Sequence, residues 1–126
     1  MLEHFVPSIH PINLFTSICY NEENEIVIGA TISHFFSIPF NYSKYVNSCE
    51  IIYHQDLDFS YVKTDFEKKE FIDHTDIIVT LTPEETKLFK KNSLDTFVQI
   101  RIVNNKDEVM YDEPHRIKIK KPLKVD

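Results

Sequence analysis

From about residue 25 onward, hydrophobic and polar side chains alternate along the chain, which is the pattern of β-strands with one buried face. The alternation is clearest in residues 76–81 and 97–103. Their predicted inward positions are Ile77, Val79, Leu81, Val98, Ile100 and Ile102. Further strands are predicted at residues 26–28, 32–40, 49–54, 59–63, 108–111 and 116–120. The chain is therefore predicted to form a set of short antiparallel strands.

Helix and loop signals interrupt this alternation after residue 63. Thr82 is a predicted helix N-cap, and Glu85, three residues later, would close a capping box. We expect Leu88 and Phe89 to anchor the resulting helix to the core. Residues 64–71 are charged and are expected to be loosely ordered.

Together these signals predict a mostly β fold, an antiparallel β-sandwich of the immunoglobulin-like type. It would have about seven or eight short strands, turns every 8–12 residues or so, and one short helix near residues 83–91. Residues 25–126 would form this domain.

Residues 1–24 have a different character and are predicted to form an N-terminal arm. Two prolines interrupt any helix there, and only residues 15–20 would suit a strand. The arm carries several apolar side chains, which we expect to be buried on the domain or on a neighbouring subunit. Those of interest are Phe5, Ile12, Leu14 and Phe15.

Composition narrows the function. The 126 residues are 42% hydrophobic and 13% aromatic, which suits one ordered domain, and the single glycine, Gly29, excludes a Gly-rich phosphate-binding loop. The net charge is −6, with the basic excess confined to residues 114–126, so nucleic-acid binding is not expected. No secretory signal or membrane-spanning run is visible, so no membrane partner is expected either. Cys19 and Cys49 lack CxxC spacing, and buried thiols in a reducing compartment are favoured over a disulfide between them.

The residues that could perform chemistry form no recognised motif. No two of the six histidines have HxH or HxxxH spacing. A metal site assembled from His54, His74 and Asp73 is one hypothesis, and scattered surface histidines explain the pattern better. The adjacent Glu84 and Glu85 are explained by helix capping and the helix dipole. We therefore expect no catalytic residue, no metal, no cofactor and no enzymatic activity.

A basic stripe is predicted near the C-terminus. Alternation along the last strand places Arg116, Lys118 and Lys120 on the face opposite Ile117 and Ile119. Two interpretations remain open: the lysines protect a solvated edge strand from pairing with another sheet, or the stripe docks onto an acidic partner surface.

Four motifs follow one another between about residues 28 and 121. The first runs from Gly29 to Phe40, and the others are at residues 49–55, 78–86 and 98–102. In order and spacing they resemble a group of small β-domain proteins encoded in the structural gene modules of tailed bacteriophages. That group has an Arg-Gly-Thr-Thr-Pro-Thr-His block leading to Phe-x-Leu-Pro-Phe, a strand ending Tyr-Ala-Gln, a Val-x-Leu-Thr-Gln-Glu-Glu-Thr box and a Val-Gln-Ile-Arg-Val strand. The matching residues of the first motif include His34, Phe36, Pro39 and Phe40, whereas Ile28 and Ile32 replace its Arg and Pro.

The resemblance implies a non-enzymatic virion structural protein that binds other virion proteins, copies of itself among the options. It would be assembled in the host cytoplasm and serve as capsid decoration or as a neck, tail or fibre-base accessory. The alternative is a phage-encoded binding domain that recognises a host molecule. The chain departs from the group in its additional residues 1–27 and in residues 111–114, which replace an Ala-Ser-Asp segment. The candidate partner-binding residues are Phe5, Ile12, Leu14, Phe15, Arg116, Lys118 and Lys120.

Overall fold

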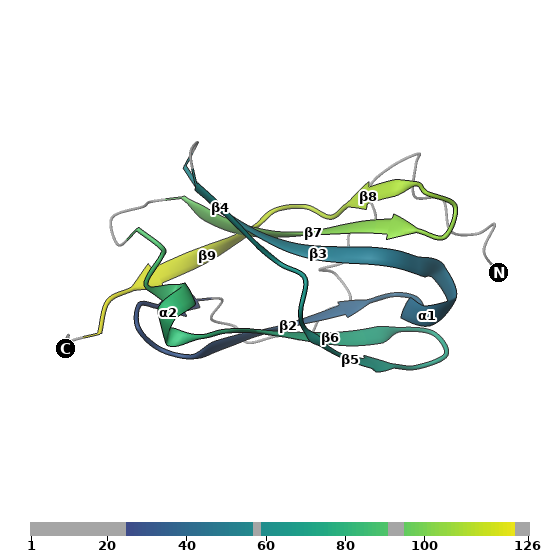
Figure 1. Ribbon diagram of the computed structural model, residues 1–126, viewed down its shortest axis with the longest axis horizontal. Coiled ribbons are helices and arrows are strands. Elements are labelled where there is room, and N and C mark those ends of the chain that lie inside the picture. Colours follow the sequence, from purple (N-terminus) through teal and green to yellow (C-terminus); the bar gives the residue numbers. More distant parts are fainter. Residues whose placement is uncertain (1–24, 57–58, 91–94, 123–126) are drawn as a thin grey trace.

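The computed structural model describes residues 25–56, 59–90 and 95–122. These residues form nine strands and two four-residue helices, and the strands are stacked as two sheets (Figure 1). The predicted mostly β sandwich is thereby confirmed. Neither described helix has the length that a membrane span requires.

The larger sheet has the strand order β1-β9-β7-β3-β4. The short strand β8 pairs with the last part of β7, whereas β9 pairs with its first part. Its strands are β1 (Glu25–Val27), β3 (Val46–Gln55), β4 (Phe59–Lys63), β7 (Thr96–Asn104), β8 (Val109–Tyr111) and β9 (His115–Lys120). Strand β1 is parallel to β9, and the other pairs are antiparallel.

The smaller sheet has the order β2-β6-β5 and is antiparallel throughout. Its strands are β2 (Ile32–Ile38), β5 (Glu67–Glu70) and β6 (Thr75–Leu81). In chain order, β2, β6 and β5 correspond to strands B, E and D of an immunoglobulin domain, and β9, β7, β3 and β4 to G, F, C and C′. The strand order therefore agrees with the immunoglobulin-like type predicted from the sequence.

The core lies between the two sheets and is built from alternate residues of each strand. Its central buried side chains are Phe36, Ile38, Cys49, Ile51, Tyr53, Ile77, Val79, Leu81, Val98, Ile100 and Ile102. They include every inward position predicted for residues 76–81 and 97–103. Strand β2 ends at Ile38, immediately before Pro39, which has no backbone N–H to donate.

Two short helices connect the sheets. The first, α1 (Tyr42–Tyr45), is capped by the side chain of Asn41, and the second, α2 (Pro83–Thr86), has the predicted capping box. The Thr82 hydroxyl accepts from the Glu85 backbone N–H at 3.2 Å, and the Glu85 carboxylate accepts from the Thr82 backbone N–H at 2.8 Å.

Several local predictions are wrong. The helix is much shorter than residues 83–91, and Leu88 is 52% exposed, whereas Phe89 is buried as expected. Residues 64–71 are not loose throughout, because Glu67–Glu70 form β5, a strand that was not among those predicted. All four side chains of β5 are exposed, so no hydrophobic alternation marks it in the sequence.

Candidate binding surface

The structure separates the residues of the metal hypothesis into two local contacts. His54 lies on β3, where its Nδ1 is 2.9 Å from the Ser60 hydroxyl. His74 precedes β6, with its Nδ1 2.7 Å from the Asp73 carboxylate. The described residues contain no group of three or more His, Cys, Asp or Glu residues placed to hold a metal ion. Cys49 is buried in the core, and burial is the main cause that raises the pKa of its thiol to about 12. The thiol is therefore protonated at neutral pH.

Glu85 is a structural residue with more partners than the capping box requires. Its carboxylate accepts from the Tyr61 hydroxyl and, at 2.9 Å, from the buried Lys63 ammonium. Burial alone would raise the pKa of Glu85, but hydrogen bonds from Tyr61, the Thr82 backbone and Lys63, with the Lys63 charge, lower it to about 2. The hydrogen bond between Tyr61 and Glu85 is also the main cause that raises the pKa of Tyr61 to about 12. These contacts fasten α2 to β4.

A buried histidine joins three strands. His34 on β2 has its Nδ1 2.7 Å from the Tyr53 hydroxyl on β3 and its Nε2 3.0 Å from the backbone carbonyl of Glu25 on β1. Burial lowers the pKa of His34, and the bond to the carbonyl opposes this only in part. Because a carbonyl can only accept, Nε2 carries the proton of the neutral ring and Nδ1 accepts from Tyr53. His34 is thus a buried residue that holds β1, β2 and β3 together, and the prediction of a surface histidine is wrong at this position.

The outer face of the larger sheet carries exposed or half-buried hydrophobic side chains on β4, β3, β7 and β8. These four strands lie next to one another in that order (Figure 1). Strand pairing sets them in rows: Ile52 lies beside Val62 and Gln99, and Val103 lies beside Val109. Val62, Val109 and Tyr111 are each about 45% exposed. The outer patch, as we call it, consists of Glu50, Ile52, Val62, Gln99, Arg101, Val103, Val109 and Tyr111.

An ion pair lies in the middle row of the outer patch. The Arg101 guanidinium is 3.1 Å from the Glu50 carboxylate, and the two side chains are 30% and 34% exposed. Arg101 also donates from Nε to the Tyr111 hydroxyl at 3.1 Å and lies over the Tyr111 ring. The hydrogen bond to Tyr111 is the main cause that raises the pKa of Arg101. The outer patch therefore combines apolar side chains with one fixed acid–base pair.

The basic stripe lies on β9, a strand of the same sheet as the outer patch. Its three side chains point outward as predicted, while Ile117 is buried and Ile119 is half-buried. Arg116 pairs with Asp95 at 3.1 Å, and Lys120 with Glu25 at 3.2 Å, whereas Lys118 forms no ion pair with another described residue. Strand β9 lies between β7 and β1, so it is not the edge strand that one interpretation of the stripe assumed.

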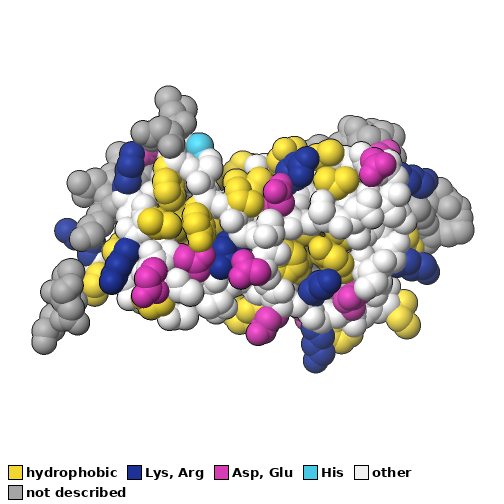
Figure 2. All heavy atoms as spheres, viewed as in Figure 1, with side chains coloured by type: hydrophobic (Ala, Val, Ile, Leu, Met, Phe, Trp, Pro, Cys, Tyr) yellow, Lys and Arg dark blue, Asp and Glu magenta, His cyan; other side chains and the backbone are white. Residues whose placement is uncertain are grey.

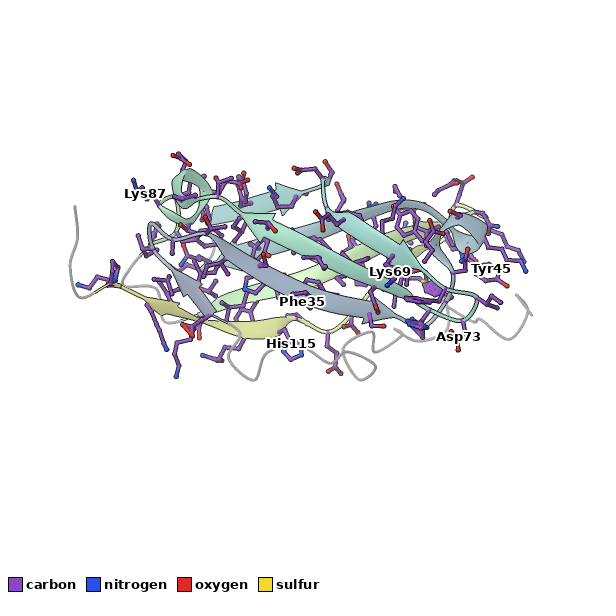
Figure 3. The ribbon with its side chains drawn as sticks, turned by 90° about the horizontal axis from the view of Figure 1, so that it is seen from below. Phe35, Tyr45, Lys69, Asp73, Lys87 and His115 are labelled. Atoms are coloured by element: carbon purple, nitrogen blue, oxygen red, sulfur yellow. The ribbon has the colours of Figure 1, made fainter. Side chains whose placement is uncertain are left out.

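A shallow groove of about 610 Å³ lies on the outer side of the smaller sheet. Figure 3 shows this side, with Phe35 near its middle and Lys69 and Asp73 toward the end at which β6 begins. Phe35 is 39% exposed, and Ile78 lies beside it on β6. At the charged end, the His74 ring stacks on Phe71 with a centroid distance of 4.4 Å. The groove thus has an apolar middle and a polar end.

The four apolar arm residues of the prediction lie outside the described residues. Their predicted partner-binding role, and that of the whole arm, therefore stays a prediction. They are Phe5, Ile12, Leu14 and Phe15.

The sequence did not single out the outer patch, although the alternation contains a signal for it. Ile52, Val62 and Val103 occupy positions that alternation assigns to the outer face, where polar residues are usual on a solvated antiparallel sheet. Which strands lie next to one another, however, decides whether such residues form one surface, and the sequence pattern does not contain that information.

No protein-family model matches the chain, and no curated protein matches it. The function of the outer patch therefore has to be inferred from its geometry and from the motifs of the sequence.

Proposed function

We propose that the protein is a non-enzymatic bacteriophage virion structural protein that binds other virion subunits through the outer patch. The observation that carries this proposal is that Val62 on β4 and Val109 and Tyr111 on β8 are each about 45% exposed, with the half-buried Ile52 on β3 and Val103 on β7 between them. Apolar side chains gathered on one sheet face mark interaction sites, because their exposure to water is unfavourable. The virion context is supported by the four motifs between residues 28 and 121.

The charge distribution is compatible with a protein partner. Figure 2 shows acidic and basic side chains interspersed with hydrophobic ones on the side of the molecule in view. The outer patch also mixes charges of both signs with apolar side chains, since the Glu50–Arg101 pair lies in its middle row, and complementary charges give protein–protein contacts their specificity. The exposed Lys118 on β9, a strand of the same sheet, would add an electrostatic contact with an acidic partner.

The experiment is incorporation into particles. Phage particles assembled with Val109→Lys are purified and the amount of the protein per particle is measured against the parent. A lysine at this half-exposed position should leave the melting temperature nearly unchanged and strongly reduce incorporation. Leu88→Lys, an equally exposed apolar position on the α2 side, is the matched control and should incorporate normally. Normal incorporation of Val109→Lys would exclude the outer patch as the virion contact.

A second candidate function is favoured by the groove on the smaller sheet. A phage-encoded domain that recognises a host molecule would use a concave surface with an apolar middle and polar groups at one end. Phe35→Ser should then reduce binding of purified particles to host cells without changing the amount of the protein per particle. If particle incorporation falls and cell binding does not, the groove belongs to assembly instead.

A further inference from the structure

We propose that the partner on the outer patch is a second copy of this chain, packed patch to patch about a two-fold axis. This inference rests on the proposed function of the outer patch as a protein-binding surface. It adds the identity of the partner and the geometry of the contact.

The outer patch is electrically neutral on an acidic chain. The whole chain has a net charge of −6, so two copies repel each other in general. Within the outer patch, however, the only charged residues are Glu50 and Arg101, one of each sign. Two outer patches can therefore approach each other without the like-charge repulsion that the chain as a whole would cause.

The positions of the two charges make the surface self-complementary. Glu50 on β3 and Arg101 on β7 lie directly opposite each other in neighbouring strands. A two-fold axis that runs along the strands, midway between β3 and β7, exchanges the positions of the two strands. It places Glu50 of one copy opposite Arg101 of the other, and it does so twice, as a self-complementary two-fold interface requires.

The same axis places apolar residues next to the charges. Ile52 on β3 and Val103 on β7 lie two residues from the ion pair along their strands, on either side of it, and so lie close to the axis. Val62 on β4 and Val109 on β8 lie one strand further out. The interface would thus bury apolar side chains around a cluster of two acids and two bases, each with an oppositely charged neighbour in both copies.

The test uses charge reversal in trans on the full chain. In a dimer of Glu50→Arg an arginine would face an arginine at both contacts, and in a dimer of Arg101→Glu a glutamate would face a glutamate. Each variant alone should therefore dimerise at least about tenfold more weakly than the parent. An equimolar mixture restores both oppositely charged contacts, so a mixed dimer should form with close to the parent affinity. Sedimentation equilibrium over a concentration series measures all three, and circular dichroism establishes that each variant is folded.

Val103→Lys, close to the axis, should also abolish the dimer, with Leu88→Lys as the control that leaves it intact. A parent protein that stays monomeric at about 100 μM, far above the dissociation constants of typical stable dimers, would overturn the proposal. So would a dimer that the charge variants and their mixture do not affect, since it would use another surface. A monomer that loses particle incorporation on Val109→Lys would overturn the two-fold contact alone. A dimer with the expected charge dependence that is absent from particles would overturn the proposed function alone.

Discussion

His34 couples the protonation of one side chain to the packing of three strands. In the folded protein the neutral ring donates to the Glu25 carbonyl and accepts from Tyr53. A second proton on the ring would introduce a charge into the space between the sheets and would force the Tyr53 hydroxyl to turn its own proton away. The folded state therefore disfavours protonation, and the pKa of His34 is lowered.

The stability of the protein should fall as the pH drops below about 6.5, the ordinary pKa of histidine. Above that pH neither state binds the proton, and below it the unfolded state binds the proton first, so unfolding becomes more favourable. The free energy of unfolding would lose up to about 1.4 kcal/mol per pH unit until the pH reaches the folded pKa. Urea titrations between pH 7.5 and pH 5 measure this slope.

His34→Gln should flatten the slope, although not completely. His115 has a pKa lowered mainly by burial and contributes in the same direction. An equal slope in His34→Gln and the parent would contradict the role assigned to His34.

Glu85 and Glu84 are neighbours that should differ sharply in their effect on stability. Glu85→Gln removes the charge that faces the buried Lys63, which among the described residues keeps an ion pair with Asp65 at 3.5 Å, and should cost about 1.5–3 kcal/mol. Glu84→Gln, at an exposed position, should cost less than about 0.5 kcal/mol. Because the pKa of Glu85 is about 2, its contribution is complete above about pH 4.5 and is lost as the pH falls toward 2. Equal melting temperatures for the two variants would contradict the structural role assigned to Glu85.

Several buried polar residues could have been found by applying the alternation consistently. His34 shares its face with Phe36 and Ile38, and Gln55 shares its face with Tyr53, so the same rule that placed the hydrophobic residues inward places these residues inward too. What the sequence could not show is which partner satisfies each polar group. The contacts of His34 with Tyr53 and Glu25 depend on how the two sheets stack.

At the scale of elements, the sequence predicted best the strands with one fully buried face. Strands β6 and β7 alternate regularly because every second side chain enters the core. Strand β5 was missed because it is an edge strand with four exposed charged side chains, so nothing in its pattern distinguishes it from a loop. Helix α2 was predicted too long because its capping box marks where a helix begins, whereas its end depends on the return of the chain to the sheet.

The basic stripe on β9 should take part in assembly. Lys118→Glu combined with Lys120→Glu should weaken incorporation into particles at low salt while leaving the fold intact. The lost pair between Lys120 and Glu25 is exposed and is worth at most about 1 kcal/mol. At 1 M salt the difference from the parent should shrink, because the screening length falls to about 3 Å. Lys68→Glu combined with Lys87→Glu reverses two exposed charges outside the larger sheet and is the control. Equal incorporation of the β9 variant and the parent at low salt would leave the stripe as an ordinary solvated surface.

At the scale of the whole molecule, the N-terminal arm should contribute to assembly and not to folding. Its four large apolar side chains could contribute on the order of 6–10 kcal/mol when buried on a neighbour. Deleting residues 1–20 should leave a domain that unfolds cooperatively and no longer enters particles. Serine at Phe5, Ile12, Leu14 and Phe15 should have the same effect in the full-length chain. A truncated protein that is incorporated normally would contradict this role.

The parallel pairing of β1 with β9 has a mechanical consequence. Glu25 lies beside Lys118 and Val27 beside Lys120, so the described chain leaves this pair of strands in opposite directions at its two ends. A force that pulls on the two ends of the described chain acts along β1 and β9 and loads all the hydrogen bonds between these strands at once, in shear. In an antiparallel terminal hairpin the same force would break the hydrogen bonds one after another. The pairing of β1 with β9 should therefore resist tension between the two ends of the described chain better than a terminal hairpin would.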